Sequence, residues 1–198
     1  MSAPGASGEE LLEFLSVMRR LRAECPWKRE QTHRSLARYL LEETHETLEA
    51  IDTGDLEHLR EELGDLLLQV YFHAVVAEET GAFTLDDVAR GISDKMVRRN
   101  PHVFGDAAKM EDAVAVNEAW EAIKATEKAR SAVTDGLPPT LPALLYADKV
   151  LDRLARQGTD VRPEGADLGD RLLALVAEAR AEGRDPEQAL RDAVRRLL

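Results

Sequence analysis

The sequence predicts an all-α protein, and three observations lead to that prediction. Alanine, leucine, glutamate and arginine dominate the 198 residues, while aromatic residues make up only 5%, a composition typical of helical proteins. Apolar residues recur at the spacing of an amphipathic helix in most segments. Capping residues and glycine or proline stop signals separate these segments. We expect one domain, or one domain with an appendage.

The start and stop signals place the first four helices. Residues 1–8 are small and polar and form a loose end, and a helix over 9–24 is broken by Cys25-Pro26-Trp27. A loop runs from there to Thr32, which caps a second helix that ends near Asp52, before Gly54. A third helix follows from Asp55 to near Gly81. Thr84 with Asp87 forms a capping box for a fourth helix over 85–99.

The second half continues the helical pattern. Pro101 stops the fourth helix, and a fifth covers 110–130. The proline-rich segment 137–142 is a rigid spacer before a helix over 143–157, and two short helices close the chain. The predicted organisation is a catalytic domain over 9–130, a spacer and helix over 131–158, and a helical tail over 159–198.

Net charge and composition exclude several functional classes. The formal net charge of −12 argues against a nucleic-acid binder, and an acidic protein with an anionic substrate needs metal ions and local basic residues. The single cysteine, Cys25, excludes an internal disulfide. No apolar run is long enough to span a membrane, and the N-terminus lacks a signal peptide. We therefore expect no membrane partner and a cytoplasmic location.

Two acidic clusters stand out between residues 40 and 73. The first is Glu42-Glu43-x-x-Glu46, and the second is Glu62-x-x-Asp65. On the second helix Leu36, Leu40, Thr47 and Ala50 share one face, and Glu43 interrupts that stripe. On the third helix we predict the apolar stripe Leu59, Leu63, Leu66 and Val70, with Glu62 and Asp65 beside it. Carboxylates next to apolar stripes cost free energy unless they are paired or bind a cation.

The short connection at Gly54 makes the two helices antiparallel neighbours, so the clusters face each other. Such a group repels itself and takes up protons unless a cation screens it. A ligand set made only of oxygen suits Mg²⁺, with Mn²⁺ as a substitute. The alternative is that these are ordinary solvated glutamates.

Basic and aromatic residues supply candidate nucleotide contacts. Lys95, Arg98 and Arg99 end the fourth helix, where they either complement the helix dipole or bind phosphate. Trp120 and Lys124 lie four residues apart on the fifth helix. They are either a core tryptophan with a snorkelling lysine or a base-stacking ring beside a phosphate-binding ammonium.

Five blocks of the sequence resemble the MazG family of nucleoside triphosphate pyrophosphohydrolases. They are CPWKREQTH, YLLEETHETLEAI, LREELGDLLLQVYFHA, DKMVRRNPHVFGD and NEAWEAIK, and they follow the family order between about Leu11 and Gly158. The resemblance implies a MazG-like four-helix catalytic bundle that is completed by homodimerisation. It implies metal binding by Glu42, Glu43, Glu46, Glu62 and Asp65, and nucleotide contacts by Lys95, Arg99, Trp120, Lys124 and, from the CPW loop, Trp27.

Two features depart from the family pattern, Lys28 and His45, which falls between the acidic positions and is not a family ligand position. Lys28 stands where relatives often carry an acidic residue. The tail repeats the earlier block as DLGDRLLALVAEA from Asp167 but lacks a second EExxE, so it resembles a degenerate second MazG domain that cannot assemble a metal site.

The expected reaction is NTP + H₂O → NMP + pyrophosphate. Glu43, Glu46, Glu62 and Asp65 hold Mg²⁺, Glu43 thereby takes part in catalysis, and Glu42 orients or deprotonates the water. The physiological task is control of nucleotide levels or clearance of non-standard nucleotides. Two alternatives stay open, a non-catalytic helical regulator with the same metal site, and a di-iron carboxylate protein built on Glu42-x-x-His45.

Overall fold

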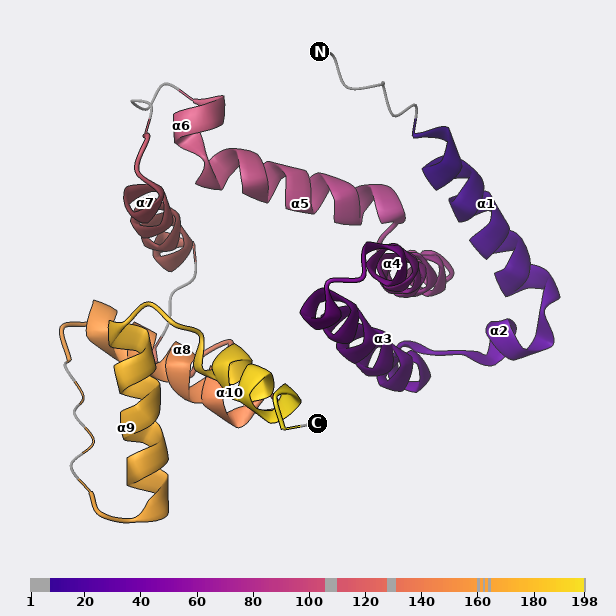
Figure 1. Ribbon diagram of the computed structural model, residues 1–198. Coiled ribbons are helices and arrows are strands. Elements are labelled where there is room, and N and C mark those ends of the chain that lie inside the picture. The colour runs from indigo at the N-terminus through magenta and orange to yellow at the C-terminus, as the bar shows by residue number, and fades with distance from the viewer. Residues whose placement is uncertain are drawn as a thin grey trace. The chain divides into compact units, whose positions relative to one another are not determined.

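A computed structural model describes residues 8–105, 110–127, 131–159, 161, 163 and 165–197. Within these residues the chain forms ten helices and no strand (Figure 1), which confirms the all-α prediction. The predicted loose end over 1–7 and the predicted helix end over 128–130 lie outside the described residues. The helices are α1 Glu9–Glu24, α2 Pro26–Glu30, α3 His33–Thr53, α4 Leu56–Glu78, α5 Leu85–Arg99, α6 Pro101–Phe104, α7 Ala113–Thr126, α8 Ala143–Arg156, α9 Leu168–Ala181 and α10 Pro186–Arg195.

The chain divides into two compact units, Met1–Trp120 and Glu121–Leu198. The boundary falls inside α7, so the predicted catalytic range 9–130 extends past it, while the predicted spacer helix and tail belong to the second unit. None of the described helices combines the length and the apolar character that crossing a membrane requires.

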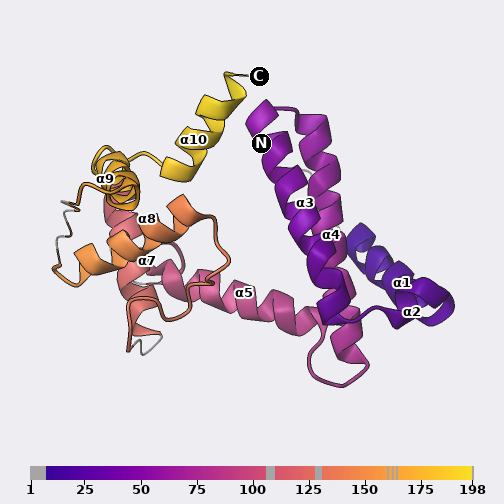
Figure 2. The same cartoon turned by 90° about the horizontal axis from the view of Figure 1, so that it is seen from below.

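The hairpin of α3 and α4 is the centre of the first unit. Thr32 caps α3 by accepting a hydrogen bond from the Ser35 N–H, and Gly54 ends the helix in the left-handed conformation, with φ of 72°. Asp55 then accepts hydrogen bonds from the N–H groups of Glu57 and His58 and starts α4. Because this turn is so short, the two helices run antiparallel and pack along their lengths (Figure 2).

The hydrophobic core of this unit lies where α1 joins the hairpin. Its buried members are Leu15, Met18, Leu36, Tyr71, Phe72 and Val75. The Tyr71 hydroxyl donates a hydrogen bond to the carbonyl of Leu11, and Arg19 pairs with Glu78 at 2.9 Å. The packing of α1 against α4 therefore fixes the position of α4, which carries the acidic residues Glu62 and Asp65.

The predicted loop after Cys25 contains a short helix, α2, because Pro26 occupies the first helical position instead of only ending α1. Arg22 fastens this segment. Its largely buried guanidinium donates hydrogen bonds to the carbonyls of Lys28 and Gln31 and to the carboxylate of Glu79. Pro101 behaves in the same way as Pro26, since it starts the one-turn helix α6 directly after α5.

In the second unit, α9 and α10 pack on α8. Arg180 of α9 bridges Asp148 at 2.7 Å and Asp152 at 3.1 Å, both on α8. The Asp167 side chain accepts a hydrogen bond from the Asp170 N–H and caps α9. The carboxylate of Asp167, in the segment predicted to be a degenerate repeat, therefore serves as a helix cap.

Candidate active site

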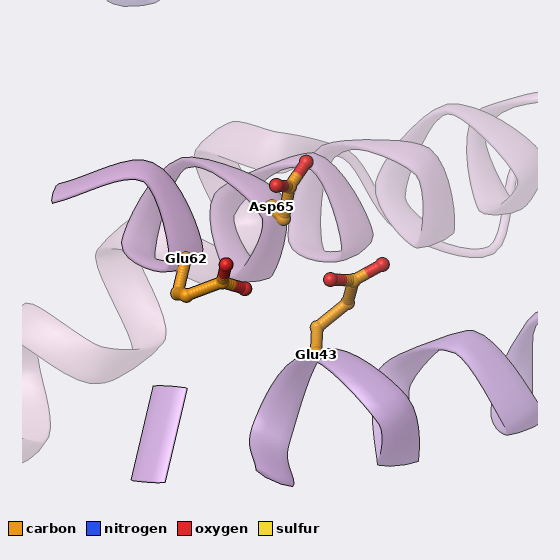
Figure 3. A group of neighbouring side chains, drawn as sticks. All are labelled: Glu43, Glu62 and Asp65. Carbon is orange, nitrogen blue, oxygen red and sulfur yellow. The ribbon is translucent and has the colours of Figure 1, made fainter. Parts of the chain in front are cut away.

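Three carboxylates meet between α3 and α4. Glu43 projects from α3 toward Glu62 and Asp65 on α4 (Figure 3), and one oxygen of each lies within 4.8 Å of the others. Glu62 is 7% exposed, while Glu43 and Asp65 are half-buried. The structure therefore brings together one acidic residue of the first cluster and both of the second.

The predicted apolar stripe of α4, made of Leu59, Leu63, Leu66 and Val70, is wrong for Leu63 and Val70. Leu63 is 52% exposed and Val70 is 44% exposed, whereas Glu62 and Gln69 are buried. The segment Leu66-Leu67-Leu68 puts leucines on most sides of α4, so apolar spacing does not single out one face. Packing against α1 and α3 decides which side chains point inward.

Glu43, Glu62 and Asp65, referred to below as the trio, repel one another electrostatically, and a cation would relieve that repulsion. The pKa of Glu43 is raised, first by burial, then by the charges of Asp65, Glu46 and Glu62 and by a hydrogen bond with Glu46. Among the described residues, buried Oε2 of Glu62 has no hydrogen-bond partner. A cluster made only of carboxylate oxygens, one of them buried and unsatisfied, fits a hard divalent cation.

The other two glutamates of the first cluster lie at its edge. Glu46 is exposed on α3, close enough to Glu43 to raise the pKa of that carboxyl. Glu42 is also exposed and pairs with Arg38 at 3.5 Å, so it does not belong to the trio. His45 is exposed as well, and the Glu-x-x-His arrangement of the di-iron alternative does not point into the cluster.

His58, which was not among the predicted site residues, contacts Glu62. Its Nε2 lies 3.0 Å from Glu62 Oε1, one turn earlier on α4. The i, i+4 spacing of His58 and Glu62 was the available signal. A histidine that holds one oxygen of a ligand carboxylate is a common support of metal sites.

The basic and aromatic candidates are divided between the two units, because Lys124 belongs to the second unit and the others belong to the first. Lys95, Arg98 and Arg99 lie in the last two turns of α5, and the Arg99 guanidinium lies 5.2 Å from the centre of the Trp120 ring. Lys124 pairs with Glu121 at 2.7 Å on α7. The cation–π contact joins two of the predicted nucleotide contacts from separate helices.

Trp27 presents an accessible indole on α2. It is 49% exposed, its ring meets Tyr39 of α3 edge to face at 6.0 Å, and Lys28 Nζ lies 5.4 Å from its centre. Tyr39 was not a predicted site residue. Tyr39 lies one turn before Glu43, so it links the indole to the helix that carries Glu43.

Comparisons with known proteins identify relatives of this chain. The profile of the MazG nucleotide pyrophosphohydrolase domain matches residues 31–104, which contain the whole trio.

The chain is 47% identical to a 26.1 kDa protein of Streptomyces cacaoi, over 94% of this chain and 78% of that protein. It is 39% identical to the nucleoside triphosphate pyrophosphohydrolase/pyrophosphatase MazG of Thermotoga maritima, over 94% and 82% respectively. It is 47% identical to the nucleoside triphosphate pyrophosphohydrolase of Escherichia coli K12, over 86% of this chain and 66% of that protein. The chain therefore belongs to the MazG family of nucleotide pyrophosphohydrolases.

Proposed function

We propose that this protein hydrolyses nucleoside and deoxynucleoside triphosphates to the nucleoside monophosphate and pyrophosphate, with Mg²⁺ as its cofactor. The observation that carries the proposal is the convergence of Glu43, Glu62 and Asp65 on one point between α3 and α4. Its Thermotoga and Escherichia relatives are named nucleoside triphosphate pyrophosphohydrolases, which supports the reaction class.

The residues divide the work by their chemistry. Glu43, Glu62 and Asp65 hold the cation, and Glu46 adds a fourth carboxylate from the edge. When bound, Mg²⁺ neutralises charge on the triphosphate and lowers the pKa of a coordinated water. Glu42 lies on the adjacent exposed side of α3 and is the candidate that orients or deprotonates the attacking water.

The substrate contacts come from the basic and aromatic group. Lys95, Arg98, Arg99 and Lys124 supply charge-assisted hydrogen bonds to phosphate oxygens. Trp120 and Trp27 offer rings for the base, and because every base has a stacking face, such contacts tolerate several nucleobases. A broad substrate range suits either control of nucleotide levels or removal of non-standard nucleotides.

We further propose that the protein works as a homodimer. Leu40 of α3 and Leu63 and Val70 of α4 expose apolar surface on the hairpin that carries the trio. A second copy that covers these side chains would complete the four-helix arrangement and remove apolar surface from water. Light scattering gives the oligomeric mass that tests this part.

The test of the reaction is hydrolysis of ATP and of deoxynucleoside triphosphates in ¹⁸O-water with Mg²⁺, followed by mass spectrometry of the first products. We expect monophosphate and pyrophosphate, with a single ¹⁸O in one of the two. Diphosphate and orthophosphate as the first products would refute cleavage of the α–β linkage. Nucleotide binding without turnover would favour the non-catalytic regulator.

A further inference from the structure

Gln69 is a buried polar side chain without an assigned role. It is 4% exposed, and its Oε1 has no hydrogen-bond partner among the described residues. Leaving a buried amide oxygen unpaired costs free energy, so native proteins seldom do so without a reason. Glu62 Oε2 is also buried and without a hydrogen-bond partner among the described residues. Glu62 lies seven residues before Gln69, two turns earlier on the same face of α4.

Two contacts locate Gln69 along the α3–α4 interface. At one end Glu43 meets Glu62 and Asp65, and at the other His33 Nδ1 lies 2.7 Å from His73 Nδ1. Gln69 lies between them, four residues after Asp65, which corresponds to about 6 Å along the helix. Its side chain therefore enters the interface one turn from the trio.

Neighbouring side chains leave the amide oxygen unpaired. In the antiparallel pairing, the stretch of α3 opposite Gln69 contains Leu36, which is fully buried and has no donor. At the far end, His73 uses Nδ1 for His33, and its buried Nε2 has no hydrogen-bond partner among the described residues either.

We infer that Gln69 is a positioning residue of the metal site, with its amide oxygen accepting a hydrogen bond from a water molecule on the bound cation. The inference rests on the proposed function, because it needs the trio to hold a divalent ion. Mg²⁺ keeps several of its waters when it binds to protein carboxylates, and such waters need acceptors. A neutral amide provides an acceptor without adding a charge to a cluster that already repels itself.

The experiment measures Mn²⁺ binding to the full chain without nucleotide, by the EPR signal of free Mn²⁺. Gln69→Met removes the acceptor and keeps the length of the side chain. We expect Mn²⁺ affinity to fall about tenfold, while the melting temperature in EDTA stays constant or rises by about 2–4 °C. Gln157→Met makes the same chemical change at an exposed residue of the second unit and should alter neither quantity.

A second variant keeps the inference testable if Gln69→Met does not fold. Gln69→Glu retains an oxygen at the same place and should bind Mn²⁺ at least as tightly as the wild type. Unchanged Mn²⁺ affinity in Gln69→Met, or weaker binding in Gln69→Glu, overturns the assignment and leaves Gln69 as a packing residue. Pyrophosphate release by the wild type is measured in parallel, so that failure of the proposed function is seen separately.

Discussion

His58 Nε2 lies 3.0 Å from Glu62 Oε1, and both residues belong to the same face of α4. This contact engages Oε1, while the buried Oε2 has no hydrogen-bond partner among the described residues, and the carboxylate belongs to the trio with Glu43 and Asp65. Glu62 is thus held by its own helix before any cation binds.

From this contact we predict that His58→Leu weakens Mn²⁺ binding about tenfold. The Glu62 carboxylate loses its hydrogen bond and can rotate away from the other two ligands. Calorimetric titration of the protein with Mn²⁺ gives the affinity, and His45→Leu on the exposed side of α3 is the matched control. Equal affinity in the two variants would show that His58 does not orient Glu62.

Glu43→Gln should abolish turnover and at the same time stabilise the protein in EDTA at pH 7. The raised pKa of Glu43 means that the folded state binds its proton more tightly than the unfolded state does. The free energy of unfolding therefore falls as pH rises from the pKa of Glu43 in the unfolded state through its higher pKa in the folded state. At pH 7 Glu43 is ionised and the full repulsion is present. Thermal unfolding at pH 4 and pH 7 measures the effect, with Glu61→Gln on the exposed side of α4 as control. If Glu43→Gln melts below the wild type at pH 7 in EDTA, the repulsion is not significant.

Metal should act as a stabilising ligand through the same trio. Saturation at 100 times the dissociation constant adds about 2.7 kcal/mol to the free energy of unfolding. We expect Mg²⁺ to raise the melting temperature of the wild type but not of Asp65→Asn. An equal rise in both proteins would place the cation elsewhere.

The contact between His33 and His73 predicts a pH dependence below neutrality. Burial, and then the charge of His33, lower the pKa of His73, so the unfolded state takes up this proton at a higher pH than the folded state. The contribution of His73 to stability is fully present above about pH 6.5, the ordinary pKa of histidine in the unfolded state. It is lost as pH falls from there through the lower pKa of His73 in the folded state. Urea unfolding of His73→Phe should vary less between pH 7 and 5 than that of the wild type or of His45→Phe. Identical pH profiles would refute this prediction.

Arg22→Ala should cost about 2–3 kcal/mol of stability, because it leaves the carbonyls of Lys28 and Gln31 without their donor and Glu79 without its partner. Arg20 makes only an exposed pair with Glu24 on the same helix, so Arg20→Ala should cost less than about 0.5 kcal/mol. Denaturant unfolding compares the two. Limited proteolysis at Arg29 should accelerate only in the Arg22 variant, and similar losses in both would mean that the α2 segment does not depend on Arg22.

Most of the fold follows from local signals. Thr32, Gly54, Asp55 and Thr84 each act on the backbone within a few residues, so the helix ends near them were predictable. The orientation of α4 was not, because contacts with other helices leave Leu63 exposed and bury Gln69. Likewise, the i, i+3 spacing of Glu62 and Asp65 places both on one side of a helix and could be predicted. The burial that leaves Gln69 Oε1 without a partner among the described residues depends on tertiary packing and could not.

The turn at Gly54 and Asp55 gives the trio an early origin in folding. Glu43 and Asp65 are separated by only about 20 residues, and closing such a short loop costs little chain entropy. The hairpin can therefore form while the ribosome is still making the second unit, and a cation held by Glu43, Glu62 and Asp65 would then cross-link its two arms. In this protein the centre that would carry the chemistry is also among the first parts of the chain able to assemble.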